Sequence, residues 1–246
     1  MPGLTDFQRH LGAATLFSSL LLAACGGSSS INGNPPGQPG AGGEVPPPGN
    51  SAPYTPRHWL ITPGPDATRD ALEAFIAAGP GDEIEFASGY FEMDTGLVLQ
   101  NGENVTIRGA GRDDTVLNFR GSNTAEGILV SNTRGVTLRD MSVVDTPGDG
   151  IKVKGSDFVN FVDLRMLWSS ANLPVAANNV PASMQWGCPD DYQPSSSNGR
   201  YAIYPVESRH ILVDGIEAIG ASDAGIYVGQ SDDVIVRNSR AAFNVA

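Results

Sequence analysis

The heptapeptide Gly-Ile-Leu-Val-Ser-Asn-Thr at 127–133 decides the fold, because variants of it return three times along the chain. The variants are Gly-Ile-Lys-Val-Lys-Gly-Ser at 150–156, Ala-Ile-Tyr-Pro-Val-Glu-Ser at 202–208 and Gly-Ile-Tyr-Val-Gly-Gln-Ser at 225–231. Their starts are separated by 23, 52 and 23 residues, and 52 is one period of 23 with 29 residues added. Self-similarity at a fixed period of this length is typical of a repeat architecture.

A second marker has the same period. Short apolar segments begin at Val136, Val159, Ile211 and Val234, again 23, 52 and 23 residues apart. Each segment alternates apolar and polar residues as a strand does, and each is too short to fold alone. A unit of this length with three short strands has the size of one turn of a parallel β-helix, whose coils stack about 4.8 Å apart.

Stacked coils should place equivalent residues in columns at the turns. One expected column is polar and holds Thr133, Ser156, Ser208 and Ser231. The next alternates in sign, so that neighbours attract, and holds Arg134, Asp157, Arg209 and Asp232. A third holds Asp140, Asp163 and Asn238, residue types that tolerate a left-handed backbone. We interpret these columns as structural, including Arg209 beside His210.

The pattern Gly-Ile-x-Val-x-x-Ser, followed by Val-x-Ile/Leu-x-Asp/Asn, resembles the right-handed parallel β-helix repeats of the pectin-lyase-like superfamily. It is most similar to the bacterial β-helix lipoproteins, and more distantly similar to alginate epimerases and NosD-type periplasmic proteins. The resemblance covers about residues 82–246 and implies an all-β, right-handed solenoid, but it does not transfer any chemistry. The sequence ends inside a coil that Val234 opens, so we expect a C-terminally truncated domain.

A short amphipathic helix is predicted ahead of the first strands, from a cap at Asp66 to about Ala78. Gly79-Pro80-Gly81 ends it, and segments 82–86 and 89–93 then alternate as strands. Such a helix would cover the open end of a β-helix, where unpaired strand edges are otherwise exposed. Its apolar positions at helical spacing are Ala67, Ala71, Leu72, Phe75 and Ile76.

The N-terminal part indicates export. Leu11 to Leu22 is an apolar run too short to span a membrane, and it ends in Leu22-Ala-Ala-Cys25, which resembles the bacterial lipobox. In that family the cysteine thiol receives a diacylglycerol, and Gly26 in place of aspartate implies the outer membrane, on the periplasmic or cell-surface side. The alternative is an ordinary signal peptide with a chance cysteine. We therefore expect a signal peptide (1–24), a disordered Gly/Pro/Ser tether (25–56) and a β-helix domain (57–246).

The net charge of the chain argues against some classes of binding partner. The chain has 246 residues and a net charge of -12, which argues against nucleic acid or anionic lipid, since both need clustered Lys and Arg. Membrane contact is expected only through the lipid anchor. The two lysines, Lys152 and Lys154, lie two residues apart. Cys188 is expected to be buried, with no internal disulfide.

The 29 added residues lie between about Ser170 and Tyr201, directly before a Gly-Ile-type strand. We expect them to form a wall beside the outer face of that strand, with Trp186 and Arg200 in it. Strand alternation then predicts two outward columns. They hold Leu129, Lys152, Tyr204 and Tyr227, and Ser131, Lys154, Val206 and Gly229. Aromatic rings suit the apolar faces of sugars, and lysines suit the carboxylates of uronic acids; alternatively these are solvated residues and ordinary strand formers.

The leading hypothesis is binding or modification of polysaccharide, with a uronic-acid lyase or epimerase as the first enzymatic form. Such an enzyme needs a base and a positive charge beside the sugar carboxylate. Lys152 and Tyr204 are the candidate catalytic residues, and we expect Lys154 to lower the pKa of Lys152. The remaining substrate-binding candidates are Lys154, Tyr227, Arg200 and Trp186.

A hydrolase activity and a metal site have weaker support in the sequence. A hydrolase needs two facing carboxylates, but Asp149 and Asp223 do not share a register position. The Asp-Pro-His sequence of similar alginate epimerases is absent, which favours the alternative of a non-catalytic scaffold or interaction protein. No cofactor is expected, because His58 and His210 are the only histidines after the signal peptide. Calcium is an alternative, although no Asp/Asn loop has calcium-binding spacing.

Overall fold

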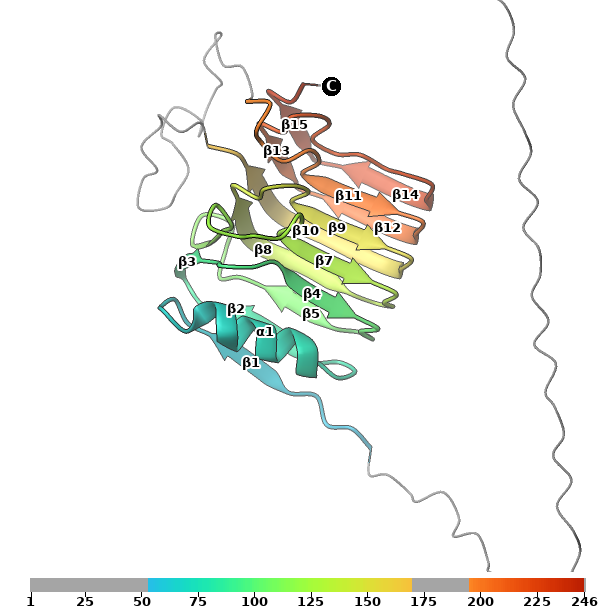
Figure 1. The fold of residues 1–246 in the computed structure, drawn as a ribbon. Coiled ribbons are helices and arrows are strands. Elements are labelled where there is room, and N and C mark those ends of the chain that lie inside the picture. The colour runs from blue at the N-terminus through green and yellow to red at the C-terminus, as the bar shows by residue number, and fades with distance from the viewer. Residues whose placement is uncertain (1–52, 170–194, 246) are drawn as a thin grey trace, which may run out of the picture. The chain divides into compact units, whose positions relative to one another are not determined.

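The described residues, 53–169 and 195–245 of a computed structural model, form a stack of coils with α1 (Ala67–Ala77) at one end (Figure 1). The strands at the other end of the stack belong to the C-terminal part of the chain. The strands are β1 (His58–Ile61), β2 (Glu83–Phe86), β3 (Gly89–Glu92), β4 (Leu97–Gln100), β5 (Thr106–Arg108), β6 (Thr115–Asn118), β7 (Ile128–Ser131), β8 (Thr137–Val144), β9 (Ile151–Lys154), β10 (Asp157–Leu167), β11 (Ile203–Val206), β12 (Arg209–Asp214), β13 (Glu217–Ile219), β14 (Asp232–Arg237) and β15 (Arg240–Ala242).

Two parallel sheets build the stack. The larger sheet follows the order β1-β2-β5-β8-β10-β12-β14, and the smaller one the order β4-β7-β9-β11. Every strand pair among the described residues is parallel and joins one coil to the next, as in β7 with β9 and β8 with β10. The fold is therefore a right-handed parallel β-helix, as the repeat predicted.

The register confirms both sequence markers. Ile128 pairs with Ile151, and Ile151 with Ile203. Val159 pairs with Ile211, and Ile211 with Val234. The fourth Gly-Ile segment, around Ile226, pairs only through isolated bridges of Ile203 with Ile226 and Val206 with Gly229.

Two strands lie outside the predicted repeat. β1 pairs with β2 in the first coil, although its sequence has no repeat partner. Leu97 of β4 pairs with Ile128 of β7, so the coil between them is longer than the 23-residue period. The longer coil hides β4 from a search at a fixed period.

The capping helix forms as predicted, with two differences. Its buried residues are Ala67, Thr68, Ala71, Ala74 and Phe75, whereas Ile76 is 81% exposed. The prediction for Ile76 is wrong because it lies one residue, or about 100° of helix rotation, beyond the buried stripe. Asp66 occupies the N-cap without a side-chain cap hydrogen bond, and its Oδ1 instead accepts a hydrogen bond from Arg69 at 2.8 Å.

Apolar side chains fill the coil interior, and a smaller apolar cluster lies on the opposite face of the larger sheet. Strand alternation places Leu117 and Met166 inside, and Val116 and Leu167 outside. The outer cluster is nonetheless buried, with exposures of only 1 to 3%. Its members are Val116, Val144, Leu167 and Ile219, with Tyr90 and Phe243 packed against them.

The polar column is a hydrogen-bonded ladder. The Oγ1 of Thr133 donates to the Oγ of Ser156 at 3.1 Å, and the backbone N–H of Thr133 donates to the same oxygen at 3.1 Å. The Ser208 and Ser231 hydroxyls accept from the backbone of the preceding coil in the same way. The ladder satisfies turn N–H groups that lie below the surface.

Replacing Ser156 with alanine should lower the free energy of unfolding by about 1 to 2 kcal/mol, because two buried donors of Thr133 lose their acceptor. Chemical denaturation measures the change. The matched control is Ser195→Ala, because Ser195 is exposed and its hydroxyl bonds to Ser197 of the same turn. Equal effects of the two substitutions would contradict a stabilising ladder.

The charged column is also structural. Asp157 accepts from Arg134 at 2.7 Å and lies 3.8 Å from Arg209, while its other oxygen lies 2.6 Å from Nδ1 of His210. The hydrogen bond from His210 and the two guanidinium groups lower the pKa of Asp157. The imidazole of His210 is thus bonded within the turn, in the same column of ion pairs as Arg209.

Left-handed backbone recurs at several stacked turn positions. Asp140, Asp163 and Asn238 have φ of 57°, 49° and 50°, as their residue types predicted. Phe158 and His210 were not expected there, yet they have φ of 55° and 52°. Bulky side chains rarely adopt this conformation. Their rings stack at 4.4 Å, and Arg134 lies over Phe158 at 4.7 Å, which stabilises the turn.

Candidate functional site

Strand register brings the predicted column together on the outer face of the smaller sheet. Lys152 of β9 pairs with Tyr204 of β11, and Leu129 of β7 pairs with Lys152 on its other side. The bridge of Ile203 with Ile226 places Tyr227 next to Tyr204. These residues lie side by side because each belongs to a different coil, and the parallel register of the stacked strands aligns them.

Three tyrosine rings meet on this surface, and Tyr201 was not predicted. The ring centroids of Tyr201 and Tyr227 lie 4.7 Å apart and are nearly parallel, at 16°. Tyr204 lies 4.9 Å from Tyr201 and 5.3 Å from Tyr227. We call Tyr201, Tyr204 and Tyr227 the tyrosine face; Tyr227 is 43% exposed, and the other two are half-buried.

Lys152 borders the tyrosine face and is held by two carboxylates. Its Nζ lies 5.1 Å from the ring centre of Tyr204 and 3.4 Å from both Glu126 and Asp149. Burial lowers the pKa of Lys152, but Asp149 and Glu126 outweigh burial, so the pKa is raised. The expectation of a lowered pKa for Lys152 is therefore wrong, because the attraction of Asp149 and Glu126 determines the direction of the shift. Lys154 is itself paired, since its Nζ lies 3.7 Å from Glu207.

Asp149 is the most enclosed charged group at this site, with 9% exposure. Burial raises the pKa of Asp149, and Glu126 adds to this effect, whereas Lys152 and Arg200 oppose it. The carboxyl group consequently takes up a proton more readily than an ordinary aspartate. It lies one residue before a Gly-Ile strand, in the same column as Glu126 and Tyr201.

Arg200 contacts the tyrosine face at Tyr201. Its guanidinium lies 5.1 Å from the ring centre of Tyr201, and Nη2 donates to the Tyr201 hydroxyl at 3.1 Å. The same nitrogen lies 3.8 Å from Asp223. Burial and Asp223 raise the pKa of Tyr201, against the opposing effect of Arg200. Tyr201 therefore stays protonated at neutral pH.

The structure thus brings together Lys152, Tyr204, Tyr227 and Arg200, with Lys154 in the next column along the strand. Tyr201 and Glu126 were not predicted as site residues, and Asp149 was considered only for a hydrolase. The repeat alignment contains the signal for all three, because each directly precedes a Gly-Ile or Ala-Ile pair. Trp186, Cys188 and Cys25 lie outside the described residues, so the predictions for them are untested.

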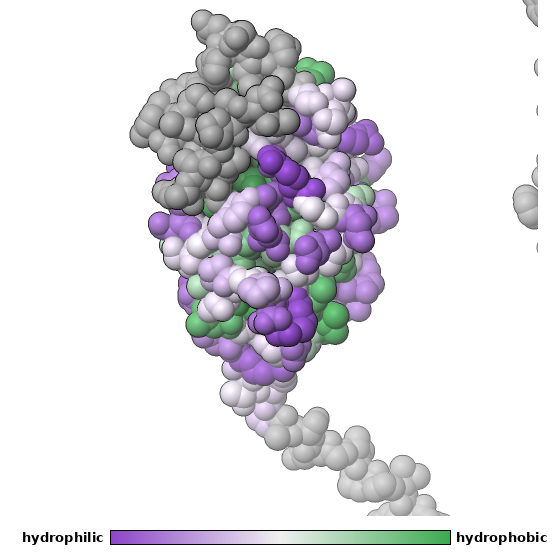
Figure 2. All heavy atoms as spheres, turned by 60° about the vertical axis from the view of Figure 1, so that its left-hand side comes forward, coloured by the Kyte–Doolittle hydropathy of each residue, from purple (hydrophilic) through white to green (hydrophobic). Residues whose placement is uncertain are grey.

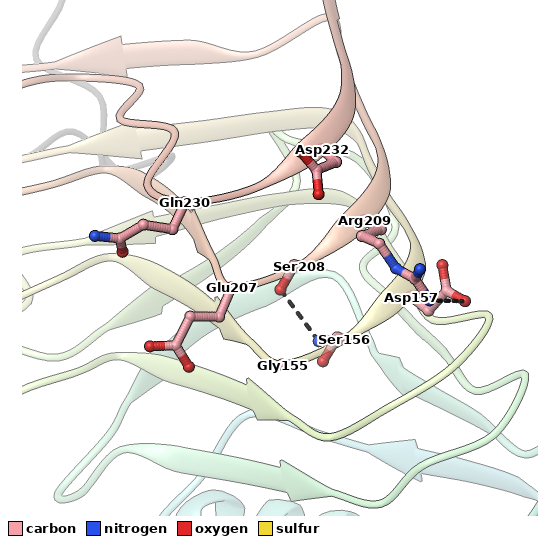
Figure 3. Close-up of a pocket in the computed structure, with 8 residues that line it drawn as sticks. All are labelled: Gly155, Ser156, Asp157, Glu207, Ser208, Arg209, Gln230 and Asp232. Carbon is pink, nitrogen blue, oxygen red and sulfur yellow. Dashed lines mark hydrogen bonds and ion pairs between the residues drawn. The ribbon is translucent and has the colours of Figure 1, made fainter.

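A polar hollow lies at the turns that follow the smaller sheet (Figure 3). Asp157, Ser208 and Arg209 line it, and the hydrogen bond from the Ser156 backbone N–H to the Ser208 hydroxyl crosses it. Five of its lining residues belong to the polar and charged columns, namely Ser156, Asp157, Ser208, Arg209 and Asp232. On the side shown in Figure 2, hydrophilic side chains cover much of the stack, with small apolar areas between them.

One group of described residues has the spacing of metal ligands. The ligand atoms of His58, Glu83 and Glu85 all lie within 4.8 Å of one another on β1 and β2. Arg108 forms ion pairs with both glutamates, at 2.8 and 2.6 Å. A cation would have to displace this arginine, so we assign no metal here.

The similarity of this chain to known proteins is distant. No protein-family model and no curated protein matches the chain. Among solved structures it is similar to an alginate lyase from Paenibacillus sp. str. FPU-7, with 13% identity over 75% of this chain and 66% of that one, and a TM-score of 0.44. The strand pairing of the described residues is that of a right-handed parallel β-helix.

Two further structures have the same 13% identity. They are ORF18 of Geobacillus virus E2, with a TM-score of 0.42 over 76% of this chain and 41% of that one, and the PL6 family alginate lyase AlyGC, with a TM-score of 0.31 over 72% and 29%. This chain therefore spans less than two thirds of each of the three. Likenesses this distant carry no argument about the activity of this chain. The part of the chain that the structure describes contains no helix that could cross a membrane.

Proposed function

We propose that this β-helix binds polysaccharide on the tyrosine face. The observation that carries the proposal is the packing of three partly exposed tyrosine rings, 4.7 to 5.3 Å apart, on a rigid outer sheet surface. Aromatic faces receive the apolar C–H faces of sugar rings, and the rigid strands reduce the entropy lost on binding. The surrounding carboxylates and guanidinium can accept or donate hydrogen bonds to hydroxyls.

The enzymatic form of the proposal is a uronic-acid lyase or epimerase. In elimination, a base would take the proton beside the sugar carboxylate, a double bond would form, and the bond to the glycosidic oxygen would break, with that oxygen taking up a proton. Tyr204 is the candidate base, and Lys152, Lys154 or Arg200 would neutralise the carboxylate. The two carboxylates that hold Lys152 weigh against this form, because they already neutralise the positive charge that the sugar carboxylate would need.

A polysaccharide panel tests the proposal with the full chain. We expect saturable binding to at least one polymer, and ultraviolet absorbance of the new double bond would reveal elimination. A folded chain that binds no polysaccharide in the panel would refute the proposal and leave a non-catalytic scaffold or interaction protein.

We also propose that Cys25 carries a lipid and anchors the protein in the outer membrane, with residues 25–56 as the tether. The Leu-Ala-Ala-Cys sequence after an apolar run supports this assignment. In a bacterial host, Cys25→Ser should abolish incorporation of labelled fatty acid and move the protein out of the membrane fraction. Unchanged labelling of the Cys25→Ser protein would contradict the lipid assignment.

A further inference from the structure

Each cation of the candidate site has a carboxylate partner. Lys152 lies 3.4 Å from both Glu126 and Asp149. In the remaining pairs, Lys154 lies 3.7 Å from Glu207 and Arg200 lies 3.8 Å from Asp223. Among the described residues, the positive charges expected to attract an acidic ligand are therefore compensated within the protein.

The carboxylates also outnumber the cations, with four against three in these pairs. If Asp149 holds a proton, the numbers become equal, and the site is neutral but still not cationic. The net charge of -12 adds a long-range repulsion for polyanions. A uronic-acid polymer would bring further carboxylates next to Glu126 and Glu207, and like charges at an interface are costly.

Uncharged sugars meet a favourable surface at the same place. The tyrosine rings offer apolar area, and the carboxylates of Glu126 and Asp223 remain partly exposed, at 27% and 38%. Ionised carboxylates only accept hydrogen bonds, and sugar hydroxyls are donors. A hydrogen bond to a charged acceptor is stronger than one between neutral groups.

We infer that the tyrosine face prefers uncharged sugar chains to uronic-acid polymers, and that Glu126 and Glu207 are specificity-determining residues that keep Lys152 and Lys154 paired. This inference rests on the proposed function, because it concerns the substrate class of the same surface. It also predicts how the preference can be reversed, since removing a carboxylate frees a lysine without changing the aromatic rings.

The test uses the full chain at low ionic strength, with polygalacturonate and a neutral β-glucan as probes. For the wild-type protein we expect a lower Kd for the glucan. In Glu126→Gln the ratio of the polygalacturonate Kd to the glucan Kd should fall on the order of 3- to 10-fold, because one like charge is removed and Lys152 loses a partner. Glu207→Gln should lower the ratio in the same direction through Lys154. High salt should reduce both effects.

Glu73→Gln is the matched control, because Glu73 is exposed on α1 and the substitution changes the net charge equally. A similar fall of the ratio in Glu73→Gln would assign the effect to overall charge and overturn the assignment to Glu126 and Glu207. Wild-type protein that binds polygalacturonate more tightly than glucan would overturn the inference while leaving polysaccharide binding intact. Binding to neither polymer, nor to any other polysaccharide, would remove the proposed function itself.

Discussion

Asp82→Ala is expected to lower the free energy of unfolding by about 3 to 5 kcal/mol, the usual cost of removing one partner from a buried charged network. The Asp82 side chain is fully buried beneath the N-terminal coil. It accepts hydrogen bonds from the Tyr54 hydroxyl at 2.6 Å, the Arg57 backbone at 2.7 Å and the Trp59 indole at 3.1 Å. The Gly79 backbone and the Arg57 guanidinium complete the shell. The substitution leaves these donors without an acceptor, and urea unfolding measures the loss.

Asp82 should also make stability depend on pH. Burial alone would raise its pKa, but hydrogen bonds from Tyr54, Arg57 and Gly79 outweigh burial and lower it far below the usual range. A lowered folded-state pKa means that the contribution is complete above the unfolded value of about 3.9 and is lost as pH falls below it. Asp82→Asn should therefore show a smaller decrease of stability between pH 5 and pH 3 than the wild-type protein. Parallel pH profiles would contradict this role.

Tyr204→Ala is expected to weaken polysaccharide binding by about 10- to 30-fold, the loss typical of a central aromatic contact. Tyr204 touches both other rings of the tyrosine face and lies under the Lys152 ammonium, so its removal opens the middle of the surface. Isothermal calorimetry with the best polymer of the panel measures the change. Thermal unfolding of the same sample establishes that the variant is folded.

Two matched variants separate the roles of ring and hydroxyl. Tyr204→Phe keeps the aromatic ring and should retain most of the affinity if the ring provides the contact. Phe158→Ala removes a 44% exposed aromatic ring at a turn outside the tyrosine face and should leave binding unchanged. Equal losses for Tyr204→Ala and Phe158→Ala would indicate a general effect of destabilisation rather than a binding surface.

Periodicity predicted the coil stacking because a solenoid repeats one register many times. A match between Ile151 and Ile203 in sequence becomes a backbone pair in space. The same rule predicted the outward column of Lys152, Tyr204 and Tyr227. It could not reveal β1, which has no repeat partner, or β4, whose coil is longer than the period. Length variation between strands carries no periodic signal.

The electrostatics of the site were harder to predict than its positions. Lys152 and Lys154 seemed mutually repulsive when only their spacing was considered, and a low pKa followed. In the folded chain, Glu126 belongs to the preceding coil, and its carboxylate reaches Lys152 at 3.4 Å. The sign of a pKa shift depends on such side-chain distances between coils, which strand alternation does not supply. The aromatic contacts of Tyr201 depend on ring orientation in the same way.

The stacking of one coil on the next also bears on how such a surface could change in size during evolution. Each coil contributes one row to the outer face of the smaller sheet, and neighbouring rows pair only with each other. Duplication of the gene segment for one 23-residue coil would therefore lengthen this surface by one row, about 4.8 Å, while existing rows keep their partners. A surface of this kind can grow or shorten by whole coils while the packing of the other coils is kept.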